Sequence, residues 1–363
     1  MNAPRSIGFV LNTLAAESST SAISLEASAR DALRAPTLTT PGYVRVLVAV
    51  SAWLAALLLL AFLAMAHWVT NASGAIVAGV VLLPAALLLR RTTHAEFAVQ
   101  LALAVSLAAQ ALLIGGVGML NHSIVAAAFA ALLVQALLMA LYPDKLQRLL
   151  AVLVAVAAVQ VLLVEAKFPN GVHLLTVAVA AGAAYVWLNE ARLAAGLSAP
   201  LYRPIGYGLV LALFGLLLPS LFLGVATPTG LVYPLPWISA LGLTAVLVFL
   251  ELQLLRRHAD SLADIRVLAV FGATALLVIP SLQAPGLLAA LIVLLLGFRR
   301  GNRVLLGLAF AFFSFFLSAY YYHLPISLLH KSAVLAGGGL ILLGLRALLA
   351  RLPGARLKGG THA

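Results

Sequence analysis

The chain has 363 residues, of which 64% are hydrophobic and only 9% are charged, and its formal net charge is +12. A soluble domain carries about 25% charged residues. This composition therefore excludes an ordinary soluble protein and indicates that lipid solvates most of the surface. The absence of cysteine excludes disulfides, thiol nucleophiles and thiolate metal sites.

The two ends of the chain differ in composition from its centre. Residues 1–42 are polar and rich in Ser and Ala, and their one short apolar patch is interrupted by polar residues. We interpret them as a cytoplasmic tail that is partly disordered or loosely helical, not as a signal peptide. Residues 43–352 form the predicted transmembrane domain, and residues 353–363 form a short basic cytoplasmic tail.

Twelve apolar stretches follow one another along the transmembrane domain. A membrane-crossing helix needs about 20 apolar residues, and all but the tenth stretch approach or exceed that length. The tenth covers roughly 20 Å at the helical rise of 1.5 Å per residue, so it needs flanking residues or local thinning. The predicted spans are 44–66, 72–89, 97–119, 124–142, 149–166, 172–189, 205–226, 237–255, 265–282, 286–298, 304–322 and 328–349.

The distribution of basic residues supports this span map. If both termini are cytoplasmic, all of the 22 Lys and Arg residues except Lys167 and Lys331 fall on the cytoplasmic side. Multi-pass proteins show this bias, and it explains the net charge without nucleic acid. We therefore predict an all-α polytopic helix bundle with about twelve spans and both termini cytoplasmic.

Two segments carry a resemblance to a known family. Tyr43-Val44-Arg45 with Trp53-Leu54-Ala55-Ala56 begins the first span, and the end of the chain carries Arg300-Gly301-Asn302-Arg303, Tyr321-Tyr322 and Lys331-Ser332. The chain resembles the bacterial membrane family called domain of unknown function 4401. Members are often encoded beside a second membrane family, named for a GDYxxLxY motif, so the resemblance implies such a protein as a partner. The family has no established activity, and the resemblance implies no mechanism.

Polar residues gather where spans 5, 6, 11 and 12 reach the outer surface. One interpretation is an interfacial aromatic belt with a lysine. The other is a polar pocket for a headgroup or small anion, in which Glu165 pairs with Lys331. The candidate pocket residues are Glu165, Lys167, His173, Tyr321, Tyr322, His323, His330 and Lys331.

The turn before span 11 offers a second candidate site. Arg299, Arg300 and Arg303 lie at its cytoplasmic surface, and guanidinium groups suit the phosphates of anionic lipids. No sequence pattern predicts a metal or cofactor.

Three functional classes follow from the sequence. One is a carrier or flippase for a lipid or small amphipathic solute, and another is a scaffold or assembly subunit acting with a second membrane protein. The third, an intramembrane enzyme, is the least supported, because Walker, HExxH and GxSxG motifs are absent. No Asp or Glu lies near the middle of a predicted span, as proton-coupled carriers usually require. The oligomeric state does not follow from the sequence.

Overall fold

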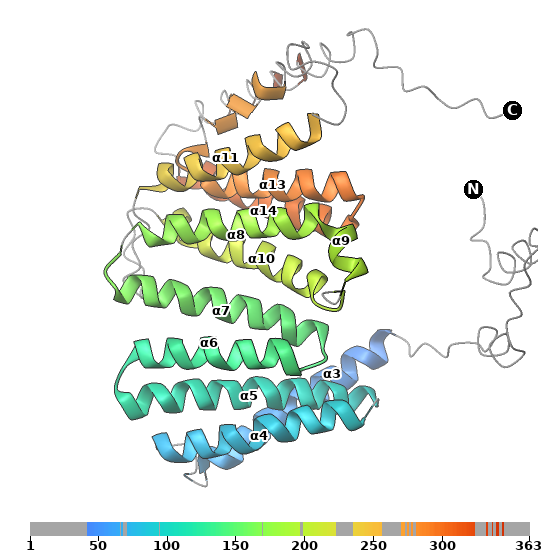
Figure 1. Ribbon diagram of the computed structural model, residues 1–363, viewed down its shortest axis with the longest axis vertical. Helices are drawn as coiled ribbons and strands as arrows, with labels where there is room; N and C mark the ends of the chain where they lie inside the picture. The colour runs from blue at the N-terminus through green and yellow to red at the C-terminus, as the bar shows by residue number, and fades with distance from the viewer. Residues whose placement is uncertain are drawn as a thin grey trace, which may run out of the picture.

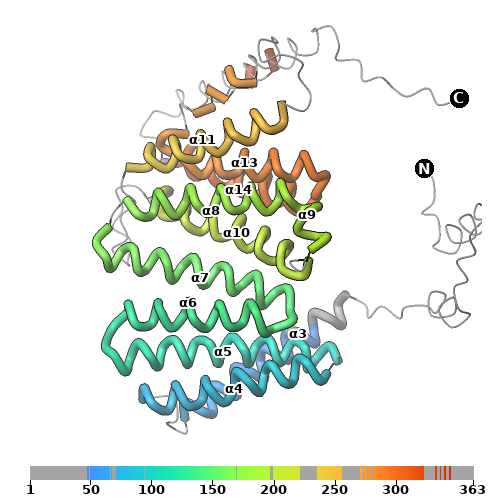
Figure 2. The backbone as a smooth tube through the Cα atoms, viewed as in Figure 1, coloured from blue at the N-terminus to red at the C-terminus, as the bar shows by residue number. Residues whose placement is uncertain are grey.

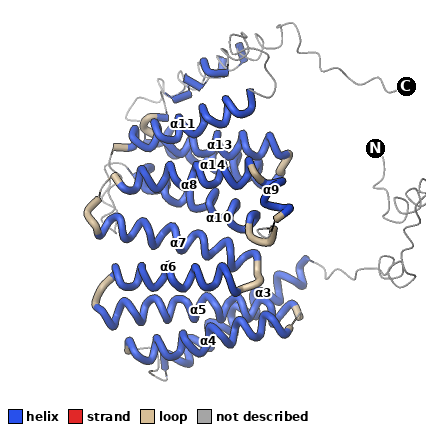
Figure 3. Tube along the Cα trace, in the orientation of Figure 1, coloured by secondary structure: helices blue, strands red, loops and turns tan. Residues whose placement is uncertain are grey.

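The computed structural model describes most of the predicted transmembrane domain. The described residues are 42–65, 67, 71–93, 95–168, 170–196, 199–222, 235–255, 270–272, 274–275, 277–278, 281–323, 332, 336, 339–340 and 343–344. Within them every regular element is a helix (Figure 3).

The elements follow the predicted order closely. They are α3 (Gly42–Met65), α4 (Ala72–Thr92), α5 (Glu96–Asn121), α6 (Ile124–Leu141), α7 (Lys145–Glu165), α8 (Gly171–Leu188), α9 (Glu190–Ala195), α10 (Tyr202–Leu217), the 3-10 turn η1 (Leu218–Phe222), α11 (Pro236–Leu255), α13 (Pro285–Arg300) and α14 (Arg303–His323). The short helix α9 lies in a loop for which the sequence predicted no element.

The long helices lie side by side and form a stack along the long axis of the molecule (Figure 1). Both α3 and α4 pack on α5, while α6 packs between α5 and α7. Farther along the stack, α10 packs on α7 and α8, and α13 packs on both α11 and α14. Successive long helices reverse direction up to α10, so the connecting turns gather at the two ends of the helices (Figure 2).

Among the described residues, eight helices are long and apolar enough to cross a membrane. This confirms a multi-pass helical membrane protein. The tenth predicted span corresponds to α13, whose 16 residues are short of a full crossing. The predicted spans 265–282 and 328–349 fall partly or largely outside the described residues, so the count of twelve and the cytoplasmic location of the termini stay predictions.

Capping explains two of the differences between the observed and the predicted helix boundaries. The α7 helix begins at Lys145, four residues before the predicted span, because the Asp144 carboxylate accepts hydrogen bonds from the amides of Leu146 and Gln147. The α13 helix runs on to Arg300 because Gly301 adopts a left-handed conformation with φ of 61°. Such a residue closes a helix C-terminus, and Asn302 then caps the start of α14.

The two halves of the stack differ in thickness. In the C-terminal half, α8 to α14, one continuous core contains Trp187, Leu213, Leu288 and Phe316. Candidate spans α8 and α10 are each 56% buried. In the N-terminal half, α3 to α7, the core consists of small Ala-rich clusters, and α4, α6 and α7 are only 22% buried. In the thin half, α4, α6 and α7 therefore leave most of their residues unburied, whereas α5 is 44% buried. In the thick half, α14 lies at the surface and is 17% buried.

Polar side chains inside the N-terminal half join helices. The Gln135 amide of α6 donates to the Gln110 side chain of α5 at 2.9 Å, and Gln110 donates to the hydroxyl and carbonyl oxygens of Ser106. All three residues are buried. Interhelical hydrogen bonds of this kind contribute about 0.6–2 kcal/mol in a membrane. This network gives these glutamines a packing role.

The contact between Gly286 and Phe316 tests the core of the thick half. A Cβ atom at Gly286 would overlap the buried Phe316 ring. We expect Gly286→Ala to lower the free energy of unfolding by about 1–3 kcal/mol, the usual cost of overpacking. A thermal unfolding curve in detergent measures the change. Gly215→Ala is the matched control, because a Cβ there meets no atom within 4 Å. Equal unfolding temperatures for the two variants would contradict the packing described.

Candidate functional site

Basic residues occupy the turns at one end of the helices, called here the basic end. The Arg90 guanidinium lies 3.5 Å from the Asp144 carboxylate, and Arg91 donates to the carbonyl of Leu141 at the end of α6. The hydroxyl of Tyr142 lies beside them, and burial together with the Asp144 carboxylate raises the pKa of Tyr142 to about 12. This phenol is therefore neutral at physiological pH.

Arg300 joins α13 to the C-terminus of α8. Its Nε donates to the Trp187 carbonyl at 2.9 Å, and a terminal nitrogen donates to the Leu188 carbonyl at 2.7 Å. The Glu190 carboxylate lies 3.6 Å from the same Nε. The last carbonyls of a helix lack partners within the helix and carry partial negative charge. Arg300 therefore caps α8 electrostatically and fixes the position of α13.

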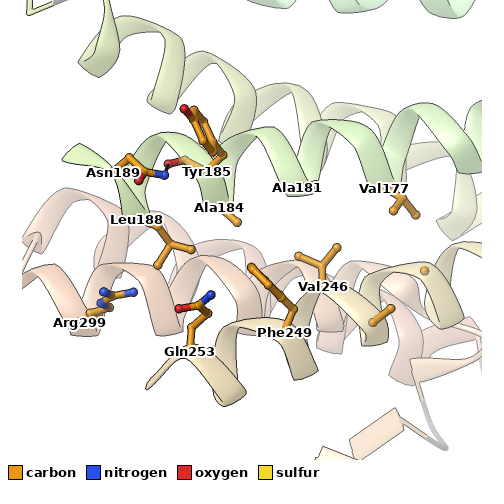
Figure 4. Close-up of a pocket in the computed structure, with 12 residues that line it drawn as sticks. Val177, Ala181, Ala184, Tyr185, Leu188, Asn189, Val246, Phe249, Gln253 and Arg299 are labelled. Carbon is orange, nitrogen blue, oxygen red and sulfur yellow. Dashed lines mark hydrogen bonds between the residues drawn. The ribbon is translucent and has the colours of Figure 1, made fainter. Parts of the chain in front are cut away.

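Beside this cap, a groove of about 590 Å³ opens between α8 and α11 (Figure 4). Gly242 of α11 packs closely against the Val177 side chain of α8. The two helices separate toward the basic end (Figure 1). The lining residues are Val177, Ala181, Ala184, Tyr185, Leu188, Asn189, Gly242, Ala245, Val246, Phe249, Gln253 and Arg299.

The chemistry of the groove changes along its length. From Val177 to Leu188 the groove follows α8 for roughly 17 Å at 1.5 Å per residue. Its body is lined by aliphatic and aromatic side chains, whereas Asn189, Gln253 and Arg299 gather at the basic end (Figure 4). An apolar body with polar groups at one end matches an amphipathic molecule with a polar or anionic head.

A family model matches residues 41–352, which is most of the chain, and its description is domain of unknown function (DUF4401). The chain belongs to the DUF4401 family. No curated protein and no solved structure matches the chain.

The arginines predicted to contact lipid phosphates separate into different environments in this DUF4401 protein. Arg299 lines the groove, whereas Arg300 is engaged by the carbonyls of α8. Arg303 is the first residue of α14. The predicted contact of these arginines with anionic lipid stays a prediction.

The residues of the predicted outer pocket lie at the end opposite the basic end, as far as the structure describes them. Glu165 and Lys167 are exposed at the C-terminus of α7, where Lys167 adopts a left-handed conformation with φ of 53°. His173 is buried in α8, and its Nδ1 lies 2.7 Å from the Ser239 hydroxyl of α11.

The remaining outer residues belong to the end of α14 or lie beyond it. Tyr321 and Tyr322 contact each other edge-on with ring centroids 5.8 Å apart, and Tyr322 is exposed. His323 ends α14 and its side chain is not described, while His330 and Lys331 lie outside the described residues. The pairing of Glu165 with Lys331 stays a prediction, as does the choice between pocket and belt.

Sequence reasoning did not find the groove as a unit. Val177, Ala181, Ala184 and Leu188 follow one another at steps of three or four residues, the spacing of one helix face. In a chain so rich in Ala and Val, this spacing also fits ordinary packing. Only the contact of α8 with α11, two helices that are distant in sequence, distinguishes this face from other apolar faces.

We expect Arg300→Gln to lower the thermal stability of the protein. The substitution removes the charge-assisted hydrogen bonds to the α8 carbonyls, which contribute about 2 kcal/mol. Thermal unfolding in detergent measures the loss. The control is Arg192→Gln, because Arg192 is an exposed residue of α9. If both variants unfold at the same temperature as the unmodified protein, Arg300 does not stabilise the end of α8.

Proposed function

We propose that this DUF4401 protein is a carrier or flippase for a lipid or small amphipathic anion, which binds in the groove between α8 and α11. The groove is the observation that carries the proposal, because it combines an apolar channel with a cationic mouth. An acyl chain lies along Val177, Ala181 and Phe249, and the anionic head contacts Arg299. Gln253 and Asn189 provide further hydrogen-bonding groups at the level of the head.

The dimensions of the groove support a lipid-like ligand. Half of a bilayer core of about 30 Å is roughly 15 Å, close to the 17 Å or so over which the groove follows α8. Tyr185 and Phe249 flank the groove and are each more than half exposed. The groove is therefore accessible sideways from the bilayer, as a ligand entering from one leaflet requires.

We place the basic end on the cytoplasmic side of a bacterial inner membrane. Arg90, Arg91, Lys145, Arg148 and Arg203 all belong to turns or helix ends at this level, and basic residues accumulate on the cytoplasmic side of multi-pass proteins. The groove then opens to the inner leaflet. The polar residues at the opposite end, Glu165 and Lys167 among them, occupy the outer leaflet, where a transported molecule would be released or accepted.

A bulky side chain in the groove tests this proposal. Ala245 lines the groove and is exposed, so Ala245→Trp fills the space without disturbing the core. We expect this variant to lose bound phosphatidylglycerol, detected by native mass spectrometry, and to slow the flipping of fluorescent phosphatidylglycerol in vesicles. Arg299→Gln removes the cation at the mouth, and we expect at least a fivefold weaker binding of phosphatidylglycerol with little effect on phosphatidylcholine.

The matched control is Ala157→Trp, because Ala157 is exposed on α7, outside the groove. It adds the same side chain to a surface that faces lipid. If Ala245→Trp and Ala157→Trp retain equal phosphatidylglycerol and equal flipping rates, the groove is not the binding site.

A second candidate function is that of a scaffold or assembly subunit, and the thin N-terminal half favours it. On α6, Phe129, Leu133 and Leu137 follow one another at intervals of four residues and are each at least half exposed. A ridge of large apolar side chains suits packing against a helix of another membrane protein. The GDYxxLxY-type protein implied by the family resemblance is the partner that we propose for this surface.

Site-specific photo-crosslinking distinguishes this second function. We expect a photoreactive residue at Leu133 to cross-link a co-expressed GDYxxLxY-type protein, because Leu133 is 74% exposed on α6. The same residue at Phe310 of α14, which is 60% exposed in the other half of the molecule, is the control. Equal cross-linking at both positions, or none at Leu133, would contradict a specific interface on α6.

A further inference from the structure

Among the described residues, one carboxylate is buried, and it lies near the basic end of α11. Glu251 lies in the last two turns of this helix and is only 8% exposed. It lies on the side of α11 that carries Leu247 and Ala240, one and three turns earlier, whereas Ala245 and Phe249 line the groove on the other side. Glutamate is almost never buried to this extent without a partner, so the environment of Glu251 requires an explanation.

The partners of this carboxyl group are few. The hydroxyl of Thr274, itself buried, donates to Oε1 of Glu251 at 2.5 Å. The second oxygen, Oε2, is shielded from solvent and receives no hydrogen bond from any described residue. One neutral hydroxyl is therefore the whole described hydrogen-bonding environment of this carboxyl group.

The charged and titratable groups on the neighbouring helices are directed elsewhere. On α13, Arg300 binds the carbonyls of α8, and Arg299 lines the groove. On α8, Tyr185 also lines the groove, and His173 bonds to Ser239, which is 12 residues, roughly 18 Å, along α11 from Glu251. The described residues form no ion pair with Glu251.

A buried carboxylate anion needs several donors or a cation to offset its lost hydration. With one hydroxyl as its described donor, the neutral acid is the more stable form in this arrangement. A proton bound to Oε2 removes the charge of Glu251 and leaves the hydrogen bond from Thr274 to Oε1 in place. A deprotonated Glu251 is stable only in an arrangement that brings water or a donor to Oε2.

We propose that Glu251 is a proton-binding site, occupied at neutral pH in the arrangement described and emptied to water when α11 moves relative to Thr274. The proton is the only species transferred, from the carboxyl oxygen to solvent water, and it returns when the helices close again. The location of Glu251 on α11 carries a further consequence, which rests on the proposed function. Because α11 also forms one wall of the groove, proton release at Glu251 changes the affinity of the groove for its ligand.

Infrared spectroscopy tests the proton site without any ligand. The protein is measured at pH 7 in a maltoside detergent, because ester carbonyls of lipids absorb where protonated carboxylic acids do. We expect the carbonyl band of a protonated acid in the unmodified protein and its loss in Glu251→Gln. Glu165→Gln is the matched control, because Glu165 is an exposed carboxylate at the C-terminus of α7, far from Glu251. It keeps the band.

A spectrum at pH 7 that is identical in the unmodified protein and in Glu251→Gln overturns the proposal, because Glu251 is then ionised. If Glu251→Gln does not yield folded protein, Glu251→Asp replaces it, and a protonated acid in a changed environment shifts the band. An unshifted band in that variant overturns the proposal equally.

The coupling is measured separately through phosphatidylglycerol binding between pH 5 and pH 9. We expect binding to change with pH in the unmodified protein and to be independent of pH in Glu251→Gln. If phosphatidylglycerol binding still changes with pH in Glu251→Gln, the proposed coupling between the Glu251 proton and the groove is wrong. If Ala245→Trp leaves phosphatidylglycerol binding unchanged, the groove function fails, and the infrared result still decides the proton site by itself.

Discussion

In the apolar part of a bilayer, each backbone amide and carbonyl has to find its hydrogen-bonding partner within the protein. Helices satisfy this requirement along their length but leave carbonyls without partners at their C-termini. At the basic end this chain satisfies such carbonyls with arginines from other elements: Arg91 reaches Leu141 of α6, and Arg300 reaches the end of α8. Arg91 and Arg300 thus join segments that are distant in sequence, whereas Arg299 lines the groove.

The two halves of the stack are held together in different ways. Around Trp187, Phe214 and Phe316, aromatic and aliphatic side chains form one thick core, in which Phe214 and Phe312 stack with ring centroids 3.8 Å apart. In the thin half, polar bonds such as that between Gln110 and Gln135 contribute where little apolar area is buried. The thick half suits a binding groove, and the thin half suits contact with lipid or another protein.

Apolar runs and basic turns predicted the all-helical membrane fold and the order of its helices, because length and hydrophobicity alone determine which segments enter a bilayer. The site was less predictable. Arg299 and Arg300 are adjacent and chemically identical in sequence, yet one lines the groove and the other caps α8. His173 looked like an outer-surface group and is buried against Ser239. Glu251 lies near the end of a predicted span and is buried. Such differences depend on contacts between helices far apart in sequence.

The close contact of Gly242 with Val177 has a mechanical consequence. The His173–Ser239 hydrogen bond and this contact join α8 and α11 at one end, and the two helices separate toward the other, so they behave as a lever whose fulcrum lies at the joined end. Over the roughly 17 Å from this fulcrum to the mouth, a rotation of about 10° moves the helix ends apart by about 3 Å, a small hinge motion of the kind that packed helices permit. A side chain larger than glycine at position 242 would shift the fulcrum. The absence of a side chain at Gly242 thus helps to set the distance between α8 and α11 along the whole groove.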